Sequence, residues 1–219
     1  MSEYQDLKTS APKTPRWQRK KDDRPQEILD AAIELFVDQG FSATKVSQIA
    51  RKAGVTPGTL YVYFKNKEAI LQEVVMKTLS QIFDEGNAIL ESYEGTSEGL
   101  VKILLDKWWE AVGSGSKISG IPKLIISEVS NFPELADFYF KRILNPTYTF
   151  ILQVLMYGIK KGDFQIADVN ATTYMIFATC HGAVIDAHSF KLAQKNNISM
   201  DAFKDHLLNI ILHGILKVK

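Results

Sequence analysis

The segment Lys45–Phe64 constrains the fold of this chain more than any other part of its sequence. Its middle holds Gly54, and glycine adopts left-handed backbone angles without the steric penalty that other residues meet. Apolar residues at helical spacing predict a short helix from Lys45 to Ala53, with Thr44 as its N-cap. A threonine cap and a proline in the first turn predict a second helix over Thr56–Tyr63. The segment is therefore predicted to be two short helices joined by a tight turn.

The remainder of the chain also follows helical periodicity, and no run alternates as a half-buried strand would. A first helix is expected to start at Pro25 and to end at Gly40, and a long helix is expected from about Lys67 to Tyr93. The glycine- and serine-rich stretch 113–120 is expected to be a flexible connector. The predicted fold is all-α, and the later helices are expected at 99–112, 121–131, 133–144, 146–161, 168–194 and 199–217.

The charge of the chain is concentrated locally rather than overall. The formal net charge is only +1, yet the stretch from Phe41 to Lys67 has five basic residues and no acidic one. A local positive patch on a nearly neutral protein indicates an anionic partner, with nucleic acid favoured first and a membrane surface second.

The second short helix carries the features that DNA contact requires. Small residues at its N-terminus permit close approach to the major groove, while tyrosine hydroxyls suit phosphate oxygens. An apolar side chain that faces outward, such as Val62, can meet a thymine methyl group. The alternative without a function is that the tyrosines are aromatic residues of the core and that the lysines lie on a solvent-exposed helix face. The residues expected to bind DNA are Thr44, Lys45, Ser47, Thr56, Pro57, Gly58, Thr59, Tyr61, Val62, Tyr63, Lys65 and Lys67.

The stretch from Phe41 to Leu71 resembles the DNA-binding segment of the tetracycline-repressor (TetR) family. The matching residues include Ala53-Gly54-Val55, Gly58-Thr59-Leu60-Tyr61 and Lys67-Glu68. The resemblance implies that residues 24–70 form a three-helix DNA-binding domain and that residues 71–219 form a helical ligand-binding and dimerisation domain. It also implies that Lys67 binds phosphate at the start of the fourth helix. Residues 1–23 are expected to be a disordered basic arm.

A helix-turn-helix protein usually binds palindromic DNA as a two-fold dimer, and the last two long helices are the best candidates for its interface. Small residues on the first of them allow close crossing, and the last helix is apolar over most of its circumference. These helices could instead be intrachain core. The residues expected at the interface are Ala171, Met175, Ala178, Gly182, Phe203, Leu207, Ile210 and Gly214.

The middle helices contain aromatic and amphipathic residues suited to an apolar pocket with a few polar groups. Such a pocket would take a small apolar or amphipathic effector, although most aromatic residues at helical spacing are plain core. The candidate ligand-binding residues are Trp108, Trp109, Phe132, Tyr139, Tyr148, Tyr174, Phe177 and His181.

Other classes of protein find little support in the sequence. The single cysteine, Cys180, fits a cytoplasmic protein, and no leader or membrane span is recognisable. Neither catalytic carboxylate pairs nor a phosphate loop nor a metal set is found at usable spacing, so neither an enzyme nor a cofactor or metal is expected. The leading hypothesis is a dimeric repressor that a small molecule releases from its operator. The alternatives are a ligand-independent regulator or activator and an all-helical enzyme acting on a phosphorylated substrate.

Overall fold

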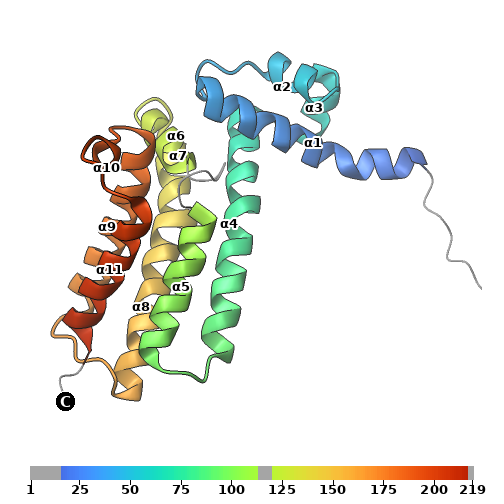
Figure 1. The fold of residues 1–219 in the computed structure, drawn as a ribbon. Helices are drawn as coiled ribbons and strands as arrows, with labels where there is room; N and C mark the ends of the chain where they lie inside the picture. The colour runs from blue at the N-terminus through green and yellow to red at the C-terminus, as the bar shows by residue number, and fades with distance from the viewer. Residues whose placement is uncertain (1–15, 113–119, 217–219) are drawn as a thin grey trace, which may run out of the picture.

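The computed structural model describes residues 16–112 and 120–216, and within these ranges the chain is all-α, as predicted (Figure 1). Three helices form a small unit at one end of the molecule, and the long helix α4 runs from that unit along the side of a helical bundle. The helices of the small unit are α1 (Arg16–Gln39), α2 (Val46–Lys52) and α3 (Pro57–Tyr63), and they are followed by α4 (Lys67–Ser92).

The bundle is built from the remaining helices, and α8 and α9 make its most extensive contact. Gly162 ends α8 in the left-handed conformation at φ 82°, as the sequence predicts for a glycine after the last helical turn. The bundle elements are α5 (Ser97–Val112), α6 (Ile121–Glu128), α7 (Pro133–Tyr139), a π-helical segment η1 (Phe140–Leu144), α8 (Asn145–Lys161), α9 (Val169–His188), α10 (Leu192–Lys195) and α11 (Met200–Ile215).

Two hydrophobic cores hold these helices together. The first includes Phe36 and Phe41 from the N-terminal unit and continues without a break into α6 and α7 through Ile125 and Leu135. The second lies inside the bundle and joins α5, α8, α9 and α11. Because α6 and α7 share a core with the N-terminal helices, the small unit is packed directly onto the bundle.

Three predicted helix boundaries are wrong. Helix α1 begins at Arg16 rather than at Pro25, because the preceding arginines, lysines and glutamine are good helix formers and extend the helix past the proline. The predicted helix 168–194 is interrupted before α10, where Lys191 adopts a positive φ of 55°. The gap expected before Pro146 is bridged by η1, since a π-helical turn accommodates a residue that lacks a backbone N–H. The disordered arm predicted for 1–23 is wrong from residue 16 onward, where the chain is part of α1. The rest of that arm and the connector residues 113–119 lie outside the described residues.

Candidate nucleic-acid interface and ligand cavity

The turn between α2 and α3 has the geometry that the sequence predicts. Gly54 has a φ of +66°, and the backbone N–H of Val55 donates to the carbonyl of Ala50 at 2.9 Å. Thr56 then caps α3 by accepting a hydrogen bond from the backbone N–H of Thr59 at 3.1 Å. Leu60 is fully buried and fixes the inner face of α3. The position of α3 is thus determined by a left-handed glycine, a cap and one buried leucine.

The outer face of α3 is open to solvent. Val62 is 78% exposed and Tyr61 is 54% exposed, whereas large apolar side chains normally bury most of their surface. A Cβ added to Gly58 would lie no closer than 3.8 Å to any atom outside its chain neighbours and helix backbone. The fold therefore does not require glycine at this position. Close approach of a partner molecule to the backbone would account for the glycine. Ser47 on α2 is exposed as well.

Two of the five basic residues of this region, Lys52 and Lys67, contact other parts of the chain. Lys45, Arg51 and Lys65 are exposed, and none of them is in an ion pair within the described part of the chain. Lys52, in contrast, pairs with Glu34 of α1 at 2.8 Å. Three cations are therefore available to an anionic partner beside α3.

Lys67, predicted to bind phosphate, has a different role in the structure. Its ammonium group donates to the carbonyl oxygens of Phe41 at 2.7 Å and Thr44 at 3.0 Å and lies 4.3 Å from the centre of the Phe41 ring. Partial burial lowers the pKa of Lys67 below its usual value. The ammonium thus joins the start of α4 to the loop before α2, and phosphate binding by Lys67 stays a prediction.

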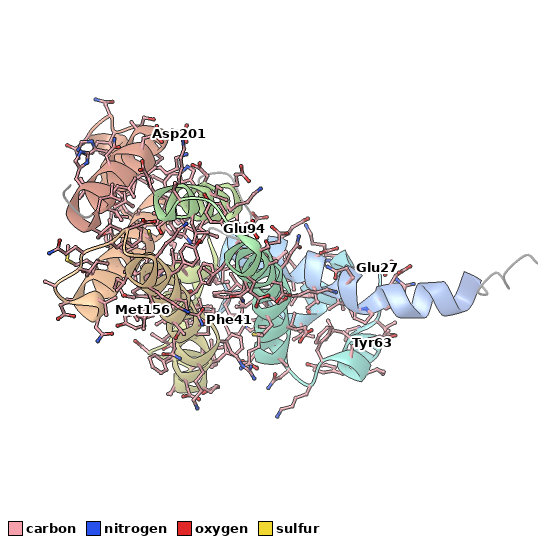
Figure 2. All side chains as sticks on the ribbon, turned by 90° about the horizontal axis from the view of Figure 1, so that it is seen from below. Glu27, Phe41, Tyr63, Glu94, Met156 and Asp201 are labelled. Carbon is pink, nitrogen blue, oxygen red and sulfur yellow. The ribbon has the colours of Figure 1, made fainter. Side chains whose placement is uncertain are left out.

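Thr44 is a predicted DNA contact that the structure contradicts. It is 1% exposed, and its hydroxyl donates to the carbonyl of Gly40 at 2.7 Å, so its side chain cannot reach a phosphate. The N-cap of α2 is Lys45, which has extended backbone angles and whose N–H donates to the side chain of Gln48 at 2.7 Å. In Figure 2, Phe41 is labelled nearer to the bundle than Tyr63, and both residues belong to or pack against the first core. Tyr63 is half-buried at the end of α3.

A second link between the N-terminal unit and the bundle has no counterpart among the sequence predictions. Glu128, at the end of α6, is 7% exposed and accepts hydrogen bonds from the hydroxyl of Ser42 at 2.6 Å and from its backbone N–H at 3.3 Å. The two residues are 86 positions apart, so no local pattern could have indicated their contact. A buried carboxylate needs such partners to offset its lost hydration.

The bundle contains an apolar cavity of about 220 Å³ that is partly open to solvent. Residues of α4, α5, α6, α8, α9 and α11 contribute to its wall, together with the end of α7 and η1. Four of the predicted ligand-binding residues line it, namely Trp108, Tyr139, Phe177 and His181.

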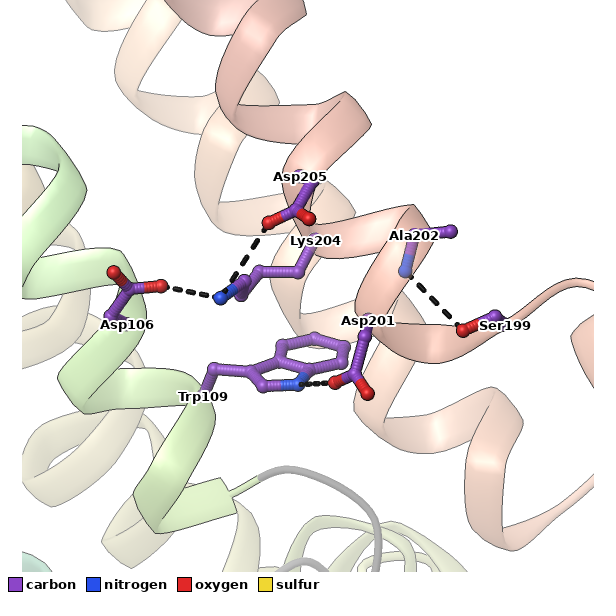
Figure 3. A network of polar contacts seen from close by, with 7 residues as sticks. All are labelled: Asp106, Trp109, Ser199, Asp201, Ala202, Lys204 and Asp205. Atoms are coloured by element: carbon purple, nitrogen blue, oxygen red, sulfur yellow. Dashed lines mark hydrogen bonds and ion pairs between the residues drawn. The ribbon is translucent and has the colours of Figure 1, made fainter.

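The other four candidate ligand residues lie elsewhere. Trp109 points to α11, where its indole N–H donates to Asp201 at 3.3 Å (Figure 3). Phe132 packs edge-on against Phe41 in the first core. The hydroxyl of Tyr148 bonds to Asn170, and Tyr174 is 62% exposed. None of these four side chains lines the cavity, because a neighbouring helix or solvent faces each of them.

One end of the cavity carries the polar pair Tyr139 and His181. The Tyr139 hydroxyl lies 3.5 Å from Nε2 of His181, and the imidazole stacks on Phe177 with 12° between the ring planes. Burial raises the pKa of Tyr139 and lowers that of His181, so both groups are neutral near pH 7. Burial also raises the pKa of the neighbouring Cys180 thiol to about 12, which makes a nucleophilic thiolate at this position unfavourable.

Helices α9 and α11 both lie on the side of the bundle away from α4 (Figure 1), and each carries exposed apolar or small residues. Met175 is 68% exposed and Ile210 is 60% exposed, and a Cβ added to Gly182 or Gly214 would meet no atom within 4 Å. Ala171 and Ala178 are exposed on the same stretch of α9.

Two residues predicted for this surface are part of the core instead. Leu207 is 7% exposed, and Phe203 packs against the core and lies 6.2 Å from the Trp109 ring. Burial of these apolar side chains turns this face of α11 to the core, and an ion pair between Lys204 and Asp106 also joins α11 to α5 (Figure 3).

The tight turn, the exposed face of α3 and the three available cations together define a helix-turn-helix DNA-binding protein. Residues 28–74 match the family model described as bacterial regulatory proteins, tetR family. The transcriptional repressor KstR2 of Rhodococcus jostii is 30% identical over 196 residues, covering 89% of this chain and 92% of that protein. The chain therefore belongs to the tetR family of bacterial transcriptional regulators.

Other relatives extend over similar lengths. The fatty acid metabolism regulator protein of Bacillus subtilis is 26% identical, over 89% of this chain and 98% of that protein. The crystal structure of FadR from Bacillus subtilis in complex with stearoyl-CoA has a TM-score of 0.71 and 24% identity, over 86% of this chain and 98% of that chain. A regulator from Saccharomonospora viridis in complex with choline has a TM-score of 0.76 and 22% identity, over 90% of this chain and all of that chain. These solved structures share the fold of this chain.

Among the residues that the structure describes, no helix is both long and apolar enough to cross a membrane.

Proposed function

We propose that this protein is a homodimeric transcriptional repressor that binds a palindromic operator through α3 and leaves it when a small molecule enters the bundle cavity. Action on chromosomal DNA would place it in the cytoplasm. The names of relatives support repression and ligand control, since one is a transcriptional repressor and others were solved with stearoyl-CoA or triclosan.

One observation carries this proposal: the same two helices line the cavity and hold the N-terminal unit. Helix α4 contributes Leu79 and Phe83 to the cavity, while Lys67 at its start binds the loop before α2. Helix α6 contributes Ile121 at its start, and Glu128 at its end binds Ser42. A ligand that pushes α4 or α6 outward therefore acts on the loop that positions α2 and α3.

In this proposal the exposed residues of α9 and α11 form the dimer interface. Helical glycines cost about 1 kcal/mol relative to alanine, and Gly182 and Gly214 both have room for a side chain. Close packing against a second copy accounts for glycine at these two positions. A two-fold dimer of this kind would present two copies of α3 to successive turns of the major groove.

The test is a binding assay in two stages. Fragments of genomic DNA that bind the purified protein are selected, and the affinity for the best fragment is measured by fluorescence anisotropy at several salt concentrations. We expect the affinity to fall steeply with salt and to depend on both half-sites. A library of small molecules is then screened for compounds that release the fragment.

Weak binding that does not depend on DNA sequence would overturn the operator-binding proposal. Specific binding that no compound reverses would favour the ligand-independent regulator, and increased transcription from a promoter beside the site would favour an activator. Turnover of a phosphorylated substrate without specific DNA binding would favour the all-helical enzyme.

A further inference from the structure

The dimensions of the cavity limit the size of its ligand. An apolar cavity of about 150 Å³ is known to hold benzene, and the cavity here measures about 220 Å³. By the same ratio it has room for an apolar body of about nine carbon atoms. Its lining includes aliphatic side chains such as Leu104 and Val154 together with the aromatic rings of Trp108 and Phe150.

Charged groups are confined to the outer part of this lining. Among the described residues that border the cavity, only Glu85 and Lys107 carry a formal charge at neutral pH, and both are exposed. Lys107 is also paired with Glu110 at 3.0 Å. Among the residues that the structure describes, the buried part of the wall thus offers neither a cation for a carboxylate nor a carboxylate for an amine. An unpaired charge moved against these residues would lose its hydration without compensation.

The described wall also carries polar groups, and two of them, Tyr139 and His181, face each other. The distance of 3.5 Å between the Tyr139 hydroxyl and Nε2 of His181 is at the outer limit for a hydrogen bond, so this contact is weak. Tyrosine can both donate and accept, and a neutral imidazole has one donor and one acceptor nitrogen. A ligand oxygen that lies beside both atoms, at about 2.8 Å from each, can form a stronger hydrogen bond to each group.

From this combination we infer that the effector is a neutral molecule with an apolar body of about nine carbon atoms and a hydroxyl or carbonyl group that binds Tyr139 and His181. The inference rests on the proposed function, because it names the class of ligand for the same cavity. Tyr139 and His181 would then determine specificity for the polar group, whereas Trp108 and its aliphatic neighbours would bind the body.

The test uses three probes that share a ten-carbon chain and differ only in their polar group: decan-1-ol, decanoate and decylammonium. Their binding to the purified full-length protein is measured by isothermal titration calorimetry at pH 7.5. We expect decan-1-ol to bind at least about tenfold more tightly than either ion, as desolvation of an unpaired charge requires. Equal or tighter binding of an ion, or no binding of any probe, would overturn the inference.

Two tyrosine variants provide the matched comparison. Tyr139→Phe keeps the buried ring and removes the hydroxyl, and we expect it to weaken decan-1-ol binding about three- to tenfold. Tyr148→Phe removes a hydroxyl that lies outside the cavity, and it should leave the affinity unchanged. Unaltered affinity in Tyr139→Phe, with wild-type melting behaviour, would also overturn the inference.

Operator binding by the same preparations separates the two proposals. Selective binding of decan-1-ol without any effect on DNA affinity would leave the ligand class standing and count against release by this cavity. Release of the operator by a charged compound, with no neutral probe bound, would leave the repressor function standing and refute the ligand class.

Discussion

Glu128 of α6 accepts two hydrogen bonds from Ser42, one from its hydroxyl at 2.6 Å and one from its backbone N–H at 3.3 Å. Helix α6 begins at the cavity with Ile121 and ends at this contact. The pair therefore lies where a change in the cavity would reach the DNA-binding unit.

Ser42→Ala should weaken the effect of an effector on DNA affinity. The variant removes the shorter hydrogen bond, so movement of α6 would be transmitted less well, and we expect the ratio of DNA affinities without and with effector to fall about fivefold or more. Effector affinity for the free protein should stay near its wild-type value. Anisotropy titrations with operator DNA, with and without effector, measure the ratio.

Ser97→Ala is the matched control for this experiment. Ser97 contacts Asp163 with the same geometry, at 2.6 Å from its hydroxyl and 3.3 Å from its N–H, but away from the N-terminal unit. It should reduce stability by about 1 kcal/mol without changing the ratio. Equal ratios in the Ser42 and Ser97 variants would refute transmission through Ser42.

Lys67→Met should lower stability and leave the salt dependence of DNA binding unchanged. Its ammonium donates to backbone carbonyls, and their loss should cost about 1–3 kcal/mol in the free energy of unfolding. Lys65→Met is the control, because Lys65 is exposed beside α3 and should behave as a phosphate contact. In that variant the slope of log K against log salt should fall by about one unit for each protomer, with no loss of stability. Urea unfolding measures the stability, and anisotropy titrations at four salt concentrations measure the slope. A reduced slope in Lys67→Met would show that Lys67 binds phosphate.

Gly58→Ala should stabilise the protein and weaken its binding to DNA. The added methyl group has room in α3, and alanine is favoured over glycine in a helix by about 0.5–1 kcal/mol. A major-groove surface that approaches Gly58 closely would meet this methyl group. Ser80→Ala, at an exposed position of α4, should keep DNA affinity unchanged. Thermal melts and operator titrations test both variants, and unchanged DNA affinity in Gly58→Ala would contradict close approach at this position.

Met175→Asp and Ile210→Asp should dissociate the proposed dimer. Each places a charge on the exposed surface of α9 and α11, and burial of an unpaired charge costs about 3 kcal/mol or more, which is at least a hundredfold in the dissociation constant. Loss of the dimer should also abolish tight operator binding. Ile103→Asp, at an exposed position of α5, should remain dimeric. Sedimentation equilibrium measures the association, and dimers in all three variants would exclude this surface.

Acid should destabilise the protein partly through His181. Burial holds the pKa of His181 below its usual 6.5, so protons bind more readily to the unfolded chain. The free energy of unfolding should therefore fall as the pH drops below about 6.5. His188, with its pKa lowered by burial and by Lys123 and Lys191, should contribute in the same direction. Urea midpoints at pH 7.5 and 5.5 should differ less in His181→Gln than in the wild type; an equal difference would contradict this assignment.

The fold and the DNA-binding turn could be predicted because their causes are local. Gly54 needs left-handed angles, Thr56 caps the next helix and Leu60 faces inward at helical spacing, and all three follow from residues within one short segment. The same reasoning could not separate Tyr174 from His181. They are seven positions apart and share a face of α9 by periodicity, yet Tyr174 is exposed and His181 lines the cavity. What packs against each turn of a helix depends on the other helices.

The sequence by itself determined the all-α architecture, the helix-turn-helix and the exposed face of α3, because periodicity, caps and a left-handed glycine act over a few residues. Only the tertiary structure decided how the charged and polar side chains are used. It directs Lys67 to backbone carbonyls rather than to solvent and joins Ser42 to Glu128 across 86 positions. It also brings Tyr139 and His181 from separate helices to one end of a cavity. Such contacts depend on side chains that are distant in sequence and become neighbours only when the helices pack.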